Sequence, residues 1–222
     1  MPENYHNPER LVKICGLNTQ ETVDAAVKAG AAMLGFVFYG SSPRAISPEL
    51  ATEFVMRLPT NVKAVGLFVD PDDAWLEQVL GQVPLDMIQL HGNESPDRVG
   101  EIKNYYPLPV IKAIKVATAE DLEQVLQYRH RADIILLDAK PPANVTTMLP
   151  GGNGISFDWN ILSDIAIPGP WMLSGGLNVH NVTEAIEMTD AHIVDVSSGV
   201  EDAPGKKSVE KIEEFLREVA RC

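Results

Sequence analysis

Three glycine-rich segments in the last third of the chain have the composition of an anion-binding site. Glycine lets the backbone turn its N–H groups toward a bound anion. One such segment alone is typical of a tight turn, whereas three together predict a phosphate site. The residues expected to contact the phosphate are Gly152, Gly154, Gly175, Gly176, Ser198 and Gly199. The sequence Ser-Ser-Gly-Val-Glu at 197–201 fits a short helical turn whose amides face the ligand.

Polar side chains stand at the ends of several apolar runs. Cys15, His91 and Asp138 each occupy such a place. A run made only for packing would carry Val, Ile or Leu there, so these residues predict chemistry. Lys13 and Asp195 lie deeper in their runs, and two interpretations stay open for them. They could take part in the chemistry, or they could form an ion pair with each other.

Arg44 is the candidate cation of the site. A lone arginine is usually solvated, and its position after Ser41-Ser42-Pro43 alone indicates no more than that. The formal charge of the chain, however, is −13. This charge argues against general nucleic-acid binding, and it means that a small anion needs individual cations placed near it. Because arginine can clamp a carboxylate with two hydrogen bonds, we expect Arg44 to bind an anionic part of the ligand.

Eight short apolar runs must position these side chains. Near-continuous hydrophobic runs of this length are typical of parallel strands that are covered on both faces. The runs cover residues 11–16, 33–38, 63–69, 86–92, 109–116, 133–139, 171–176 and 192–199.

Segments with helical spacing separate the runs. Thr19 or Asn18 can cap the first segment, and Ser-Pro pairs at 47–48 and 95–96 open the second and the fourth. The other segments cover 70–80, 118–128, 158–165, 179–188 and 207–220. Eight strand–helix units in 222 residues predict a (β/α)8 barrel. An open doubly wound sheet would place its glycine fingerprint after the first strand, and this chain does not. We expect one domain over residues 1–222, with 1–10 as a flexible N-terminal extension.

Composition limits the other possibilities. Hydrophobic residues make up 45% of the chain and charged residues 22%, which is usual for a globular protein. The two cysteines, Cys15 and Cys222, form no disulfide framework, and no run has the length of a membrane span. We expect a cytoplasmic protein without a signal peptide, a metal site or a membrane partner. Its oligomeric state is left open between monomer and homodimer.

A series of short motifs resembles the phosphoribosylanthranilate isomerases of tryptophan biosynthesis. Each motif is weak alone, but their order along all eight units is specific. They are Lys-Ile-Cys-Gly at 13–16, Gly-Phe-Val-Phe at 35–38, Ser-Pro-Arg at 42–44, Gln-Leu-His-Gly at 89–92, Leu-Leu-Asp at 136–138, Gly-Gly-Asn-Gly…Phe-Asp-Trp at 151–159, Leu-Ser-Gly-Gly-Leu at 173–177 and Asp-Val-Ser-Ser-Gly-Val-Glu at 195–201.

The resemblance implies an Amadori rearrangement without metal or cofactor. N-(5-phosphoribosyl)anthranilate would become 1-(2-carboxyphenylamino)-1-deoxyribulose 5-phosphate. The resemblance makes Cys15 the general base and Asp138 the general acid. It also assigns the anthranilate carboxylate to Arg44 and the phosphate to the glycine loops. A thiol is a poor base near neutral pH unless its thiolate is stabilised, and Lys13 or backbone amides are candidates for this.

The sequence departs from the family pattern in two places. Asn153 and Ile155 stand where threonine and a charged or polar residue are expected, so we expect altered loop detail with retained function. Asn18 stands where threonine is common, which bears only on helix capping.

Three other classes of protein fit the sequence less well. The related isomerase of histidine biosynthesis uses two carboxylates on a duplicated half-barrel, whereas this chain ends its first strand with Cys15. Ribulose-phosphate epimerases need several metal-binding residues at the strand ends, where this chain offers only His91 and Asp138. A non-catalytic phosphate binder would not require both Cys15 and Asp138.

Overall fold

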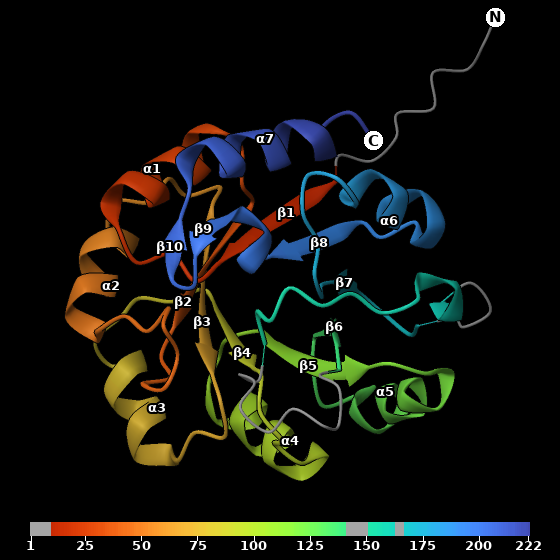
Figure 1. Ribbon diagram of the computed structural model, residues 1–222. Coiled ribbons are helices and arrows are strands. Elements are labelled where there is room, and N and C mark those ends of the chain that lie inside the picture. The colour runs from red at the N-terminus through yellow and green to blue at the C-terminus, as the bar shows by residue number, and fades with distance from the viewer. Residues whose placement is uncertain (1–9, 141–150, 163–166) are drawn as a thin grey trace, which may run out of the picture.

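Eight parallel strands close into a barrel in sequence order, as predicted. The structure is a computed structural model that describes residues 10–140, 151–162 and 167–222. Figure 1 shows the strands at the centre, surrounded by the helices. The strands are β1 (Leu11–Cys15), β2 (Met33–Val37), β3 (Lys63–Phe68), β4 (Met87–Leu90), β5 (Val110–Val116), β6 (Ile134–Ala139), β7 (Trp171–Leu173) and β8 (Ile193–Val196). The barrel closes where β1 pairs with β8.

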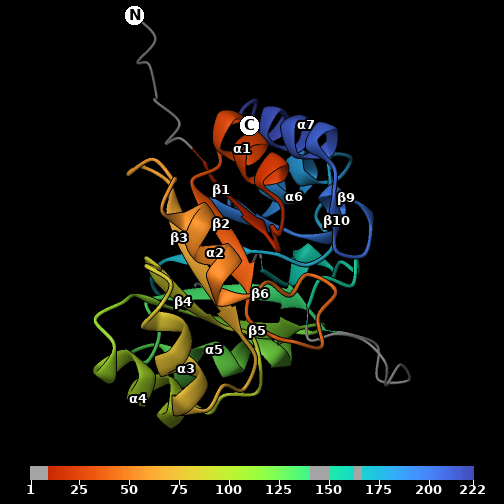
Figure 2. The same ribbon diagram turned by 90° about the vertical axis from the view of Figure 1, so that its left-hand side faces the viewer.

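The outer layer consists of helices that follow the strands (Figure 2). Thr19, Ser47 and Ser95 cap their helices through side-chain oxygens, which confirms the predicted starts. Among the described residues, no helix is long and apolar enough to cross a membrane. The helices are α1 (Gln20–Lys28), α2 (Pro48–Val55), α3 (Asp73–Leu80), α4 (Pro96–Tyr105), η1 (Ala119–Leu122), α5 (Glu123–Tyr128), η2 (Trp159–Leu162), α6 (Val182–Thr189), η3 (Ser198–Val200) and α7 (Val209–Val219).

Two connections differ from the expectation. The segment expected as a helix over 158–165 forms only the 3-10 turn η2 in its described part, and residues 163–166 lie outside the described residues. A small hairpin of β9 (Glu201–Ala203) and β10 (Lys206–Lys207) follows η3 and was not predicted. Because Lys207 ends this hairpin, α7 begins after the Ser208 cap rather than at 207. The expected extension over 1–10 lies almost entirely outside the described residues.

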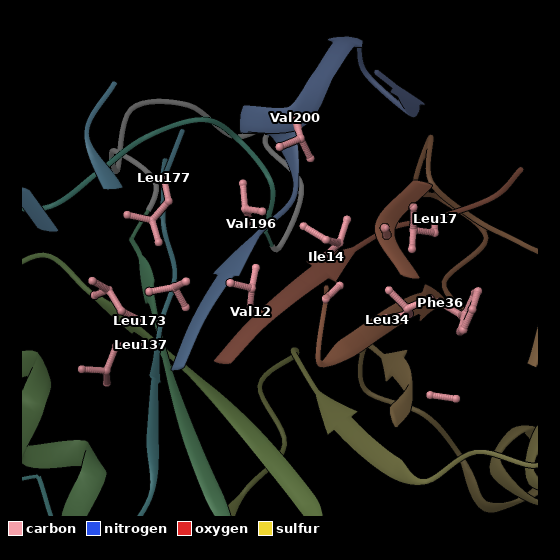
Figure 3. Close-up of a cluster of buried hydrophobic side chains, with 14 of the residues drawn as sticks. Val12, Ile14, Leu17, Leu34, Phe36, Leu137, Leu173, Leu177, Val196 and Val200 are labelled. Carbon is pink, nitrogen blue, oxygen red and sulfur yellow. The ribbon is translucent and has the colours of Figure 1, made fainter. Parts of the chain in front are cut away.

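Apolar side chains pack on both faces of the barrel wall. The larger cluster fills the layer between strands and helices, and Figure 3 shows part of it, including Val12, Ile14, Leu34 and Phe36. A smaller cluster, with Met172 among its members, fills the barrel interior. Alternate residues of each strand therefore point to opposite faces, and those that point inward near the carboxyl ends line the site.

Candidate active site

One pocket gathers most of the predicted site residues at the carboxyl ends of the strands. Gly154 and Gly199 do not line it, and their contact with ligand stays a prediction. The predicted residues in the pocket wall are Cys15, Arg44, His91, Asp138, Gly152, Gly175, Gly176 and Ser198. Ser174, Asp195 and Ser197 also line the pocket, and Val37, Leu67 and Val69 form an apolar part of its wall.

Cys15 lies beside the predicted ion pair of Lys13 and Asp195. The Lys13 ammonium is 2.7 Å from Asp195 Oδ1, and its side chain is fully buried. The Ser174 hydroxyl donates to the other oxygen of Asp195 at 3.0 Å. Gly35 on β2 leaves room for this group, because a Cβ there would lie 2.8 Å from Cys15 Sγ and 3.2 Å from Lys13 Nζ. Asp195 also lines the pocket, so the ion pair lies at the site itself.

Burial dominates the acidity of the Cys15 thiol. Desolvation raises the pKa of Cys15, and the Lys13 ammonium opposes that shift only in part. Desolvation acts against the charge on Lys13 as well, but the Asp195 carboxylate raises the pKa of Lys13 above its usual value. Cys15 is therefore a thiol at neutral pH, with a permanent cation beside it that favours the thiolate when a proton leaves.

Asp138 at the end of β6 is held by two groups. Its Oδ1 accepts the N–H of Ala139 at 2.9 Å, and its Oδ2 lies 3.0 Å from His91 Nε2. The other ring nitrogen of His91 lies 2.9 Å from Gln89 Nε2. Gly151 covers this contact closely, since a Cβ there would be 2.5 Å from His91 Nε2. The three side chains form a buried row that leads from the barrel interior to the pocket.

Arg44 is buried rather than solvated. Its Nε and Nη2 donate to both oxygens of Glu201 at 2.7 and 2.9 Å, and Nη2 also donates to the Gly152 carbonyl at 3.0 Å. The Lys207 ammonium donates to Glu201 Oε1 at 2.7 Å, the same oxygen that accepts from Arg44 Nε. Burial opposes ionisation of Glu201, but the Arg44 and Lys207 cations hold its pKa below the usual value. Glu201 is therefore an anion in the folded protein.

The loops after β7 and β8 present backbone N–H groups. The described residues offer no hydrogen-bond acceptor to the N–H of Gly175, Gly176 or Ser198. Gly175 and Gly176 both have positive φ, and a Cβ on Gly175 would lie 2.6 Å from the Ala139 nitrogen. Only glycine allows this turn to lie so close to β6. Gly199 has a packing role, because a Cβ there would collide with the Leu177 carbonyl oxygen.

The structure explains in part why Asn153 and Ile155, in the connection after β6, depart from the family pattern. Ile155 is partly buried and packs against the main core, so an apolar residue suits its place. Asn153 also makes an interaction in the folded chain.

Sequence reasoning missed the buried partners of Arg44. Glu201 stands in the quoted motif at 195–201 without a role, and Lys207 was placed at the start of a helix. The charge pattern was the available signal. Glu201 and Lys207 lie on either side of the Pro-Gly turn at 204–205, and the two strands that flank this turn pair with each other.

Comparisons with known proteins agree with this geometry. Residues 12–218 match the family model of N-(5′-phosphoribosyl)anthranilate isomerase. The chain is 53% identical over 205 residues to the isomerase of that name from Rhodospirillum centenum, covering 92% of this chain and 95% of the relative. It is 51% identical to the one from Parvibaculum lavamentivorans, covering 95% and 98%.

Solved structures give the same result. The Thermotoga maritima phosphoribosyl anthranilate isomerase superposes with a TM-score of 0.86 at 38% identity, covering 96% of this chain and all of that one. A crystal structure of a phosphoribosyl anthranilate isomerase in complex with reduced 1-(o-carboxyphenylamino)-1-deoxyribulose 5-phosphate superposes with a TM-score of 0.82 at 36% identity, with the same coverage. With eight strands, a pocket at their carboxyl ends and a match along nearly its whole length, this chain belongs to the N-(5′-phosphoribosyl)anthranilate isomerase family.

Proposed function

We propose that this chain converts N-(5′-phosphoribosyl)anthranilate to 1-(2-carboxyphenylamino)-1-deoxyribulose 5-phosphate in tryptophan biosynthesis, with Cys15 as general base and Asp138 as general acid. One observation carries the assignment of roles. Cys15 on β1 and Asp138 on β6 line the same pocket from strands that are well separated around the barrel. A sugar between them has an acid on one side and a base on the other.

The acid acts first. Asp138 protonates the ring oxygen of the ribose, the bond from that oxygen to C1′ breaks, and the nitrogen lone pair forms a C1′=N Schiff base. His91 supports this step, because its Nε2 lies 3.0 Å from Asp138 Oδ2 and orients the carboxyl group. The Ala139 N–H donates to Oδ1, so both oxygens of the carboxyl group are held in place beside the substrate.

The base acts second. The thiolate form of Cys15 removes the proton from C2′ and becomes a thiol, and the electron pair of that C–H bond forms the C1′=C2′ bond of an enolamine while the nitrogen regains its lone pair. Transfer of a proton to C1′ and loss of the hydroxyl proton at C2′ then give the ketone. The Lys13 ammonium stabilises the thiolate form of Cys15 during this exchange.

The remaining contacts hold the two ends of the substrate. Arg44 has donors left for the anthranilate carboxylate, and the glycine loops after β6, β7 and β8 supply N–H groups for the phosphate. His91, Gly152, Gly175, Gly176 and Ser198 line the pocket and contact the ligand in this proposal, with Gly154 and Gly199 beside them.

The test follows the loss of phosphoribosylanthranilate fluorescence, with substrate generated in the cuvette. We expect activity in the wild-type chain. Cys15→Ser and Asp138→Asn are each expected to lower kcat by roughly 10²- to 10⁴-fold, the usual contribution of a general acid or base. An inactive wild-type chain would refute the function, and unchanged rates in both variants would refute the roles.

We also propose a cytoplasmic enzyme that is a monomer or a homodimer. One solved relative, from Thermotoga maritima, is described as a dimeric phosphoribosylanthranilate isomerase from which monomers were generated. Sedimentation of the purified chain over a range of concentrations distinguishes the two states. Cys15 and Cys222 are both free, which suits a reducing compartment.

A further inference from the structure

Within the part of the chain that the structure describes, the Arg44 guanidinium is held by its Nε and Nη2 groups. Of its five N–H donors, the Nε donor and both Nη2 donors bind Glu201 and the Gly152 carbonyl. The aliphatic stem is also confined, because a Cβ on Gly16 would lie 2.7 Å from Arg44 Cδ. This arrangement fixes the plane of the guanidinium before any ligand arrives.

No described residue binds the opposite edge of Arg44. The described residues provide no acceptor for the two N–H groups of Nη1, although Arg44 lies in the pocket wall and is 5% exposed. A Cβ on Gly152 would lie 2.6 Å from Nη1, so this glycine keeps the approach open. Two fixed donors on a buried cation suit an anionic ligand group.

Lys207 compensates the charge of Glu201. Its ammonium lies 2.7 Å from Glu201 Oε1 and also donates to the carbonyl and the hydroxyl of Ser197, at 2.9 and 3.2 Å. The side chains of Arg44, Glu201 and Lys207 are 6%, 4% and 0% exposed. Desolvation lowers the pKa of Lys207, and the Glu201 carboxylate counteracts that shift. Glu201 alone would cancel the charge of Arg44, whereas Glu201 with both protonated cations leaves one net positive charge inside the protein.

We propose that Glu201 and Lys207 are positioning residues that make Arg44 selective for a carboxylate on the substrate's ring. Glu201 holds Arg44 in a fixed orientation, and Lys207 keeps the site cationic despite that anion. The ligand carboxylate then completes an alternating row of Lys207, Glu201, Arg44 and carboxylate. This inference rests on the proposed function, since it takes the anthranilate carboxylate as the partner of Arg44.

The test measures binding rather than turnover, so that it stands apart from the test of the activity. The probes are two stable ligands, 1-(2-carboxyphenylamino)-1-deoxyribitol 5-phosphate and the same compound without the carboxyl group. Calorimetry gives Kd for both, and their ratio is the carboxylate selectivity. Thermal unfolding of each variant confirms that it is folded.

We expect Glu201→Gln to lower the selectivity about tenfold, through weaker binding of the carboxylated ligand only. Arg44→Met should lower it at least as much, and adding Glu201→Gln to Arg44→Met should change nothing further. Glu218→Gln is the matched control, because Glu218 also pairs with an arginine, Arg221, but lies on α7 outside the pocket. Its selectivity should equal that of wild type.

Lys207→Met gives a second test if Glu201→Gln does not fold. It leaves Glu201 to cancel the charge of Arg44, so selectivity should again fall. Wild-type selectivity in Glu201→Gln or, where that variant is unfolded, in Lys207→Met overturns the inference. Equal binding of both ligands by the wild-type protein overturns it as well. A chain that binds with the expected selectivity but does not convert phosphoribosylanthranilate refutes the proposed function and leaves the present inference standing.

Discussion

Two buried charge networks at the carboxyl end of the barrel are built from the same kinds of residue but differ in whether all their hydrogen-bond donors have acceptors. In the first, Lys112 on β5 donates to Glu94 Oε2 at 2.7 Å and to the carbonyls of Gly92 and Leu90 at 2.9 and 3.5 Å. The Glu94 carboxylate also accepts the N–H groups of Asp70 and Gly92. All three ammonium donors of Lys112 therefore have protein acceptors. We call this the closed network.

The open network consists of Arg44, Glu201 and Lys207. It is as well buried as the closed one, yet Arg44 lines the pocket and its Nη1 has no acceptor among the described residues. The closed network ties the loops after β3 and β4 to each other, whereas the open network keeps donors available. A saturated network indicates a structural role, and a fixed but unsaturated one indicates a ligand site.

Breaking the closed network should cost stability. Lys112→Met leaves the Glu94 carboxylate buried without a cation, so we expect the free energy of unfolding to fall by about 3–5 kcal/mol. Urea unfolding followed by circular dichroism measures this. The double variant Lys112→Met with Glu94→Gln removes both charges and should regain part of the loss. A loss below about 1 kcal/mol in the single variant would mean that the network is not structural.

Breaking the open network at Arg44 should cost affinity instead. Arg44→Met is expected to raise KM for phosphoribosylanthranilate about 10- to 100-fold, which is roughly 1.4–2.7 kcal/mol for lost charge-assisted hydrogen bonds. Stability should change by only about 1 kcal/mol, since Glu201 keeps Lys207 as its cation. Arg221→Met on the surface is the control. The opposite pattern, a large loss of stability at constant KM, would erase the distinction between the networks.

A substitution of His91 tests whether this residue belongs to the closed network or to the active site. Its neighbour Gly92 belongs to the closed network, while its side chain faces the pocket and Asp138. We expect His91→Asn to lower kcat about tenfold, less than loss of the acid itself, because Asp138 keeps its Ala139 contact. His192→Asn, which alters an exposed histidine, should leave kcat unchanged. A His91→Asn variant with normal kcat would confine that residue to a structural role.

The regular parts of the fold were predictable because their signals are local. Strands such as β2 and β6 are continuous apolar runs, and Ser47 and Ser95 sit in front of proline at helix starts. Cys15 and Asp138 followed from the rule that strand ends line the site of a barrel.

The charge networks were not predictable in the same way. The strands β9 and β10 are too short for a period to show, and a lysine such as Lys112 in an apolar run gives no sign of its partner. Burial of Glu201 and Lys207 depends on the Arg44 guanidinium arriving from a loop far away in the chain. Such pairs are decided by tertiary structure, which no local pattern encodes.

The central claim, that Cys15 is the base, has a direct test in one titration. In a Cys222→Ser background only Cys15 can react with iodoacetamide, so its alkylation rate against pH reports its ionisation in the free enzyme. Because burial raises the pKa of Cys15, we expect that rate and kcat/KM to rise together with one apparent pKa above the usual thiol value of about 8.5. A kcat/KM that is already at its plateau where Cys15 is still fully protonated would contradict the account.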